Sequence, residues 1–170
     1  MITLMQRATV RGRVNAATIR RRAARLLAAL GRADDDLCIL LTDDEEIQVL
    51  NRQWREKDKP TDVLSFSQLE GADDVPQIQG GGAPVALGDV VISVPTAESQ
   101  VGDGCLPRLW PALGTEVSPP WTLIDEVTFL LLHGTLHLIG HDHEVDAERL
   151  EMEAREAELL PPLLNRGRGR

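Results

Sequence analysis

The stretch "VTFLLLHGTLHLIGHDH", residues 127–143, holds all 4 histidines of the 170-residue chain. Its long apolar run predicts a buried helix, and Gly140 is typical of the residue at which a helix ends. His133 and His137 are four residues apart, so a helix places both imidazoles on one face. A turn after Gly140 can then bring His143 back to the same point. The pattern predicts a helix that carries a three-histidine metal site.

Three protein ligands with an open fourth position are typical of a catalytic zinc ion rather than a structural one. The spacing equals the metzincin pattern, in which a glutamate follows the first histidine. Here that position is Gly134, which can move no proton, so peptide hydrolysis by that mechanism is disfavoured. We expect His141 to point away from the metal. Asp142 is either an acceptor that orients a ligand imidazole or a solvated turn carboxylate.

Strand and helix patterns alternate before this helix, and one more helix follows it. The order strand, helix, strand, helix, strand, strand, helix, helix predicts the α+β class, with helices packed on a small mixed β-sheet. The segments predicted as strands are "ITLMQ" (2–6), "DLCILLTDD" (36–44), which leads into the next helix, "VLSFS" (63–67) and "LGDVVIS" (87–93). Those predicted as helices are 16–31, 43–55 with Thr42 or Asp43 as its N-cap, 121–140 and 144–160, the last closed by "PP".

A single domain over residues 1–170 is expected from the chain length. Residues 70–86, with three consecutive glycines, are expected to form a loop, and residues 101–120, with four prolines and three glycines, an irregular insertion. Residues 161–170 are expected to form a flexible tail. No apolar run is long enough to cross a bilayer, which favours a cytoplasmic protein without membrane contact.

Charge is distributed unevenly along the chain. The net charge of −9 argues against indiscriminate nucleic-acid binding, because phosphate contacts require a cationic surface. Residues 1–32, however, contain eight arginines and no acid. They form either a solvated basic helix face or, together with residues 55–59, a cationic border of an RNA-binding cleft. The acidic last helix is expected to face solvent or a protein partner.

Three motifs together resemble those of the YbeY-type endoribonucleases, the bacterial rRNA maturation factors. They are "HGTLHLIGHDH" (133–143), "LNRQWREKDKPTDVLSF" (50–66) and "LGDVVIS" (87–93), in the order found in that family, and the resemblance covers most of residues 2–160. The chain departs from the family's usual pattern at Trp54, where Tyr is common, at Ser67, where Pro is expected, and in the length of 101–120.

The resemblance implies a zincin-like fold whose central helix carries one zinc ion on His133, His137 and His143. It implies cleavage of single-stranded RNA, with Arg55 as the residue implicated in activity. The expected biology is rRNA (16S 3′-end) maturation and ribosome quality control in the cytoplasm. The expected partners are single-stranded RNA or rRNA, and ribosomal proteins or a ribosome-associated GTPase.

An arginine fork beside zinc can stabilise the negative charge that develops on phosphate oxygens, which would be the role of Arg55; the alternative is a surface arginine at a helix end. Attack by a metal-activated water and attack by the 2′-hydroxyl of the RNA both remain open. Asp62 or Asp142 could accept the proton, although Asp62 also suits a turn before a strand. Two other functions remain: a non-enzymatic, zinc-stabilised ribosome assembly factor, and a metal-dependent hydrolase of another substrate.

Overall fold

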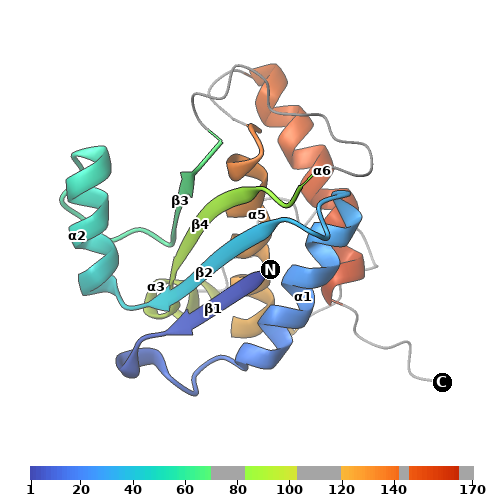
Figure 1. Cartoon of the computed structure of the whole chain (residues 1–170). Coiled ribbons are helices and arrows are strands. Elements are labelled where there is room, and N and C mark those ends of the chain that lie inside the picture. The colour runs from blue at the N-terminus through green and yellow to red at the C-terminus, as the bar shows by residue number, and fades with distance from the viewer. Residues whose placement is uncertain (70–82, 103–119, 142–145, 165–170) are drawn as a thin grey trace.

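The structure is a computed structural model that describes residues 1–69, 83–102, 120–141 and 146–164. Within these ranges it contains four strands and five α-helices, shown in Figure 1. In chain order the elements are β1 (Ile2–Gln6), the short 3₁₀ helix η1 (Ala8–Val10), α1 (Ala16–Ala29), β2 (Asp36–Thr42), α2 (Asp44–Arg55), β3 (Val63–Ser67), β4 (Ala86–Ser93), α3 (Val94–Gly102), α5 (Leu123–Leu138) and α6 (Asp146–Leu164).

The four strands form one mixed sheet in the order β1-β2-β4-β3. β1, β2 and β4 run parallel to one another, while β3 is antiparallel to β4 and lies at the edge of the sheet. Parallel neighbours need a crossover connection, which α1 supplies between β1 and β2. The predicted α+β class with a small mixed sheet is therefore confirmed.

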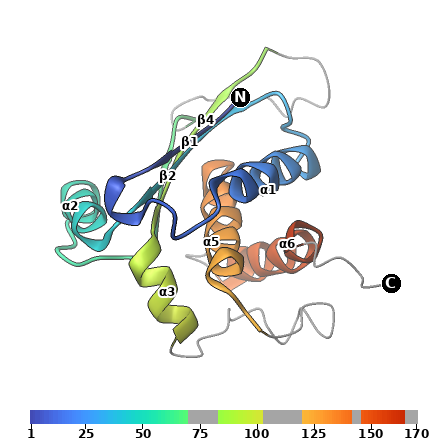
Figure 2. The same cartoon turned by 90° about the horizontal axis from the view of Figure 1, so that it is seen from below.

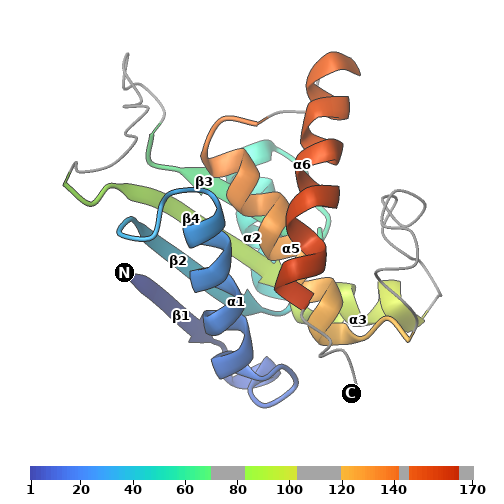
Figure 3. The same ribbon diagram turned by 90° about the vertical axis from the view of Figure 1, so that its right-hand side faces the viewer.

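Helices cover the two faces of the sheet unequally. Figure 2 shows α2 on one face and α1, α5 and α6 on the other, and Figure 3 shows α6 lying along α5. α5 is central, because it contacts β3, β4, α1, α3 and α6. That position explains its sequence: a helix that is surrounded by protein needs apolar residues on most of its circumference.

Local signals in the sequence set where these helices begin and end. The Asp43 side chain caps α2 by accepting a hydrogen bond from the backbone N–H of Glu46, and three acids occupy the first turn of α2, where the helix dipole favours negative charge. Asn15 caps α1 in the same way. Gly31, just after α1, has a φ of 70°, which glycine adopts without strain.

Arg22 of α1 is a buried cation that ties three helices together. Its guanidinium donates to the Thr128 hydroxyl at 2.6 Å and to the backbone carbonyls of Ile124 (3.0 Å) and Leu164 (3.1 Å). It also lies 3.4 Å from the buried carboxylate of Asp125. One of the eight N-terminal arginines thus holds α1, α5 and α6 in place instead of facing solvent.

Several predicted boundaries are wrong. Residues 101 and 102 belong to α3, which the sequence interpretation missed, and the rest of the predicted insertion, 103–119, lies outside the described residues. Residues 161–164 belong to α6 rather than to a tail, and residues 165–170 are not described. Pro161 and Pro162 lie inside this helix, where the burial of Leu159, Leu160, Leu163 and Leu164 outweighs the missing backbone donors.

The predicted loop 70–86 ends earlier than expected, because Ala86 already pairs as the first residue of β4. Residues 70–82 lie outside the described part of the chain.

No helix in the described ranges is long and apolar enough to span a membrane.

Candidate metal centre and cleft

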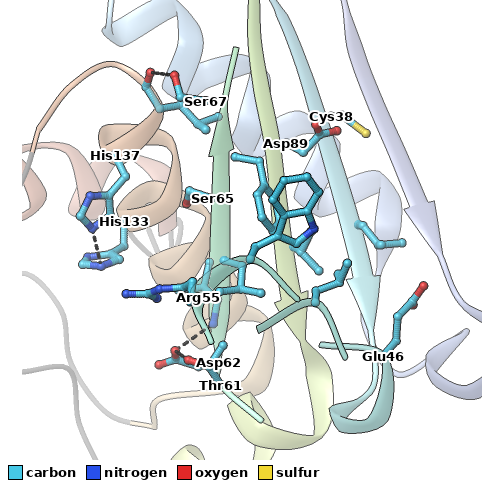
Figure 4. A pocket seen from close by; sticks show the side chains of 18 of the residues that line it. Cys38, Glu46, Arg55, Thr61, Asp62, Ser65, Ser67, Asp89, His133 and His137 are labelled. Carbon is cyan, nitrogen blue, oxygen red and sulfur yellow. Dashed lines mark hydrogen bonds between the residues drawn. The ribbon is translucent and has the colours of Figure 1, made fainter. Parts of the chain in front are cut away.

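α5 places His133 and His137 on one face, as their spacing predicts. The Nε2 atoms of the two imidazoles are 3.2 Å apart, and their ring centroids are 4.7 Å apart with the planes nearly perpendicular. Figure 4 shows the two rings side by side on the helix. Both residues line the same cleft.

A carboxylate from the last helix holds the first of these histidines. The Nδ1–H of His133 donates to Glu156 Oε1 of α6 at 2.7 Å, and the Glu156 side chain is fully buried. Because this bond occupies Nδ1, the lone pair of His133 lies on Nε2 and points toward His137. The second oxygen of Glu156, Oε2, is buried and has no hydrogen-bond partner among the described residues.

The two histidines fit a zinc ion. Two nitrogens that each lie about 2.0–2.1 Å from a tetrahedral zinc are roughly 3.3 Å from each other, close to the observed separation of 3.2 Å. Metal-binding histidines also commonly donate their other ring N–H to a carboxylate, as His133 does to Glu156. The described ranges contain no cluster of three or more metal-binding side chains. His143 and Asp142 lie outside the described residues, so the third predicted ligand is untested.

Gly134 allows α5 to pack closely against the sheet. A Cβ atom at this position would lie 2.8 Å from Val90 Cγ1 and 2.9 Å from Ser65 Oγ, closer than real Cβ contacts. The position therefore faces β3 and β4. A glutamate here would have to enter the packed contact between helix and sheet. The missing glutamate base of the metzincin pattern thus has a physical cause, since a side chain at this position would have to displace Val90 and Ser65.

The cleft has a volume of about 1270 Å³ and wraps around the edge strand β3. All five residues of β3 line it, with the histidines of α5 on one side and residues of α2 and of the outer sheet face on the other. His141, which follows Gly140, also lines the cleft, and its orientation away from the metal stays a prediction. The polar and charged residues around the cleft are Arg7, Glu46, Arg55, Thr61, Asp62, Ser65, Ser67, Asp89, His133, His137 and His141.

Arg55 is the last residue of α2, and its side chain lines the cleft. It is exposed and makes no hydrogen bond or ion pair with any residue that the structure describes. Figure 4 shows it extending past β3 toward the side on which the histidines lie. The turn after it is fixed by buried Asn51, whose Nδ2 donates to the Lys59 carbonyl at 2.8 Å. A guanidinium without a partner among the described residues thus extends toward the histidine pair (Figure 4).

Two carboxyl groups lie near the turn before β3: Asp62, which lines the cleft, and Glu126, which does not. Asp62 accepts hydrogen bonds from the Thr61 hydroxyl, the Val63 backbone N–H and the Gln100 side chain, which supports its role at the turn before β3. Burial raises the pKa of Glu126 to about 7, and the charge of Asp62 adds to the rise; a hydrogen bond from Trp121, 2.6 Å long, opposes it. Glu126 lies outside the cleft lining.

Cys38 of β2 also lines the cleft. Burial, with a smaller contribution from the neighbouring Asp89, raises the pKa of its thiol to about 11. The thiol is therefore protonated at neutral pH, and the thiolate is the form that acts as a nucleophile or binds a metal. Cys38 fits neither role in this cleft.

The predicted cationic border is only partly present. Of the arginines in residues 1–32, the cleft lining includes Arg7, and its guanidinium is engaged by Glu46 at 2.6 Å. α1, which carries four of the others, packs on the opposite face of the sheet from α2 (Figure 2). The acidic last helix does not face solvent throughout, because Glu156 is buried against His133.

These features define a class of protein: an α+β domain whose central helix presents two histidines, backed by a buried carboxylate, to a cleft at a sheet edge. A sequence model of one family, Endoribonuclease YbeY, matches residues 6–104 and 116–163. The chain belongs to this family, which confirms the resemblance seen in its motifs.

Relatives with the same description come from several bacteria. The Endoribonuclease YbeY of Paramagnetospirillum magneticum is 41% identical, over 84% of this chain and 79% of that protein. The protein of Syntrophotalea carbinolica is 40% identical, over 84% of this chain and 83% of its own length. The longer protein of an Anaeromyxobacter species is 43% identical, and the match covers 88% of this chain but only 65% of that relative.

A solved structure shares the fold. The solution structure of TM1509 from Thermotoga maritima superposes with a TM-score of 0.52 and covers 100% of this chain and 99% of that one. The sequence identity is 21%, so this likeness bears on the fold alone.

Proposed function

We propose that this protein is a zinc-dependent endoribonuclease that cuts single-stranded RNA in the cleft beside β3. The observation that carries the proposal is one juxtaposition: a histidine pair with facing nitrogens and an arginine without a partner among the described residues line the same cleft. Membership of the Endoribonuclease YbeY family gives this arrangement its substrate class.

The proposed ligands are His133, His137 and His143, with one zinc ion. Imidazole donors favour zinc over magnesium or calcium, which prefer oxygen ligands. A zinc ion held there supplies a Lewis acid that activates water and stabilises negative charge on phosphate oxygens. Through its hydrogen bond to Nδ1, Glu156 would hold the ring of His133 so that Nε2 is available to bind the ion.

Arg55 is the proposed catalytic residue. Its guanidinium can donate two parallel hydrogen bonds to the non-bridging oxygens of a phosphodiester, whose charge grows in the transition state. Because Arg55 has no anionic partner in the described residues, it need not break an ion pair to bind phosphate. Asp62 is less suited to accept the proton, since three donors already hold its carboxylate.

The proposed biology is rRNA 3′-end maturation and ribosome quality control in the cytoplasm. Single-stranded rRNA is the proposed substrate, and ribosomal proteins or a ribosome-associated GTPase are the proposed partners. Family membership supports the RNA substrate.

The test compares the cleavage of a labelled single-stranded RNA, and of its duplex, by zinc-loaded wild type, Arg55→Ala and Arg52→Ala. Arg52 is a matched control, since it lies on the same helix, is exposed and does not line the cleft. We expect wild type and Arg52→Ala to cut the single strand, and Arg55→Ala to be at least about 100-fold slower. Zinc and RNA binding without any cleavage by wild type would favour the assembly factor instead.

A further inference from the structure

Trp54 is a large aromatic side chain that stays 62% exposed in the last turn of α2. It lines the cleft next to Arg55 and meets the ring of Phe66 edge to face, with centroids 6.0 Å apart. The small core under α2 is formed by Ile47, Leu64 and Val91 and does not depend on it. An exposed tryptophan beside a cleft, which no core packing explains, indicates a binding surface.

The sheet face next to Trp54 is apolar with one acid. Cys38, Asp89 and Phe66 form one row across β2, β4 and β3, since the strand register pairs them in turn. In the neighbouring row, Met5 is exposed and Leu40 is half-buried, and both line the cleft. Two arginines line the described part of the cleft. The guanidinium of Arg7 is bound by the carboxylate of Glu46, whereas Arg55, at the end of α2, has no such partner among the described residues.

The positions of Asp89 and Arg55 favour one orientation of the bases and phosphates of a nucleic-acid strand bound in the cleft. The Asp89 carboxylate and the apolar side chains disfavour phosphate over the sheet face, whereas they suit the flat faces and amino groups of bases. Arg55 and the histidine pair suit phosphate. A strand bound here would therefore turn its bases toward Trp54 and its backbone toward Arg55.

We propose that Trp54, supported by Phe66, is the platform on which one base of a single-stranded RNA stacks while Arg55 holds a phosphate of the same strand. The inference rests on the proposed function and adds a specificity-determining residue to it. Bases inside a duplex are already stacked on both faces, so this platform selects unpaired strands. It needs no base-specific hydrogen bond, so it tolerates different sequences.

The first experiment measures KM and kcat for cleavage of a labelled single-stranded RNA by zinc-loaded wild type, Trp54→Ala, Trp54→Phe and Val49→Ala. Val49 is the matched control, because it is exposed on the same helix and lies outside the cleft lining. We expect Trp54→Ala to raise KM roughly five- to 100-fold with little change in kcat, as loss of uniform binding does. Trp54→Phe, which keeps an aromatic face, should restore most of the affinity, and Val49→Ala should match wild type.

A second experiment separates stacking from a structural effect. Single abasic positions are introduced one at a time into the same RNA. In wild type, one position should raise KM about as much as Trp54→Ala does, and in Trp54→Ala the same abasic position should add little. This non-additivity is expected only if the ring and that base contact each other.

The inference is overturned if Trp54→Ala cuts single-stranded RNA with the KM of wild type, or if every abasic position has the same effect in both proteins. Because Trp54 is largely exposed, Trp54→Ala should stay folded, which its thermal unfolding verifies, and Trp54→Leu repeats the test with an apolar, non-stacking side chain. Failure of wild type to cut RNA at all overturns the proposed function, so the two failures are distinguishable.

Discussion

His133 and Glu156 are joined by a 2.7 Å hydrogen bond although 23 residues separate them in the chain. This bond connects the central helix α5 to the last helix α6 at the level of the histidine pair. It fixes the tautomer and the ring orientation of His133, and it leaves Nε2 facing His137. The acidic last helix therefore has a direct role at the proposed metal centre.

Replacing Glu156 by Gln should weaken zinc binding by about 10- to 100-fold, because the carboxylate that orients His133 and raises its basicity is lost. The metal-free variant should remain folded, because Gln keeps the size of Glu and its amide oxygen can still accept the hydrogen bond from the His133 Nδ1–H. Competition with a chromophoric chelator measures the zinc affinity. Glu158→Gln, an exposed change on the same helix, is the control, and equal zinc affinity in both variants would contradict the account.

Gly134→Ala should lower the free energy of unfolding by about 1–3 kcal/mol, because its Cβ would overlap Val90 and Ser65. Chemical denaturation measures this loss. Gly102→Ala, at the end of α3, is the control, since its Cβ would meet nothing within 4 Å. If both glycine variants are as stable as wild type, close packing of α5 on the sheet does not require Gly134.

Arg22→Ala should destabilise the fold by about 3–5 kcal/mol, because it leaves buried Asp125 without its cation and breaks bonds that join three helices. Arg21→Ala, on the neighbouring exposed position, should stay within about 0.5 kcal/mol of wild type. Urea unfolding of the two variants is the comparison. Similar stabilities would mean that the arginines of α1 are equivalent and solvated.

The buried carboxyl of Glu126 should make stability depend on pH. Its folded pKa of about 7 lies above the ordinary value of 4.5, so the native state holds a proton that the unfolded chain releases. Stability from this group is complete below about pH 4.5 and is lost as pH rises through 7, amounting to up to about 3 kcal/mol.

Glu126→Gln should remove this dependence, since an amide does not titrate and can still accept the hydrogen bond from Trp121. The measurement is the difference in unfolding free energy between pH 5 and pH 8 for the two proteins. We expect the variant to gain on wild type at the higher pH. An identical pH profile would show that Glu126 is ionised throughout.

Most of the fold could be predicted because its signals are local. Alternating residues predict β1 and β3 at their observed bounds, and Gly31 marks the end of α1 where the structure has it. The predicted N-cap of α2 was Thr42 or Asp43, and the structure has Asp43. α3 was missed because it is short and starts with Val94 and Pro95 directly after β4, without an amphipathic pattern. α6 continues past its predicted end because the burial of the leucines around Pro161 and Pro162 outweighs the low helix propensity of proline.

The histidine pair could be predicted from spacing alone, whereas its supporting carboxylate could not, because the contact is between helices. One signal was present. Glu156 follows Met152 by four residues and precedes Leu159, Leu160 and Leu163 by three, four and seven, so it falls on the apolar stripe of its helix. An acid at such a core position must be paired, and the histidines of the apolar helix are suitable partners.

The most direct test of the metal-centred account is a zinc titration of metal-stripped protein with cleavage of single-stranded RNA as the readout. We predict that wild type gains activity in proportion to zinc and saturates at one equivalent, while His137→Ala stays inactive at every concentration. Cleavage by the metal-free wild type, or by His137→Ala to the same extent as wild type, would contradict the account.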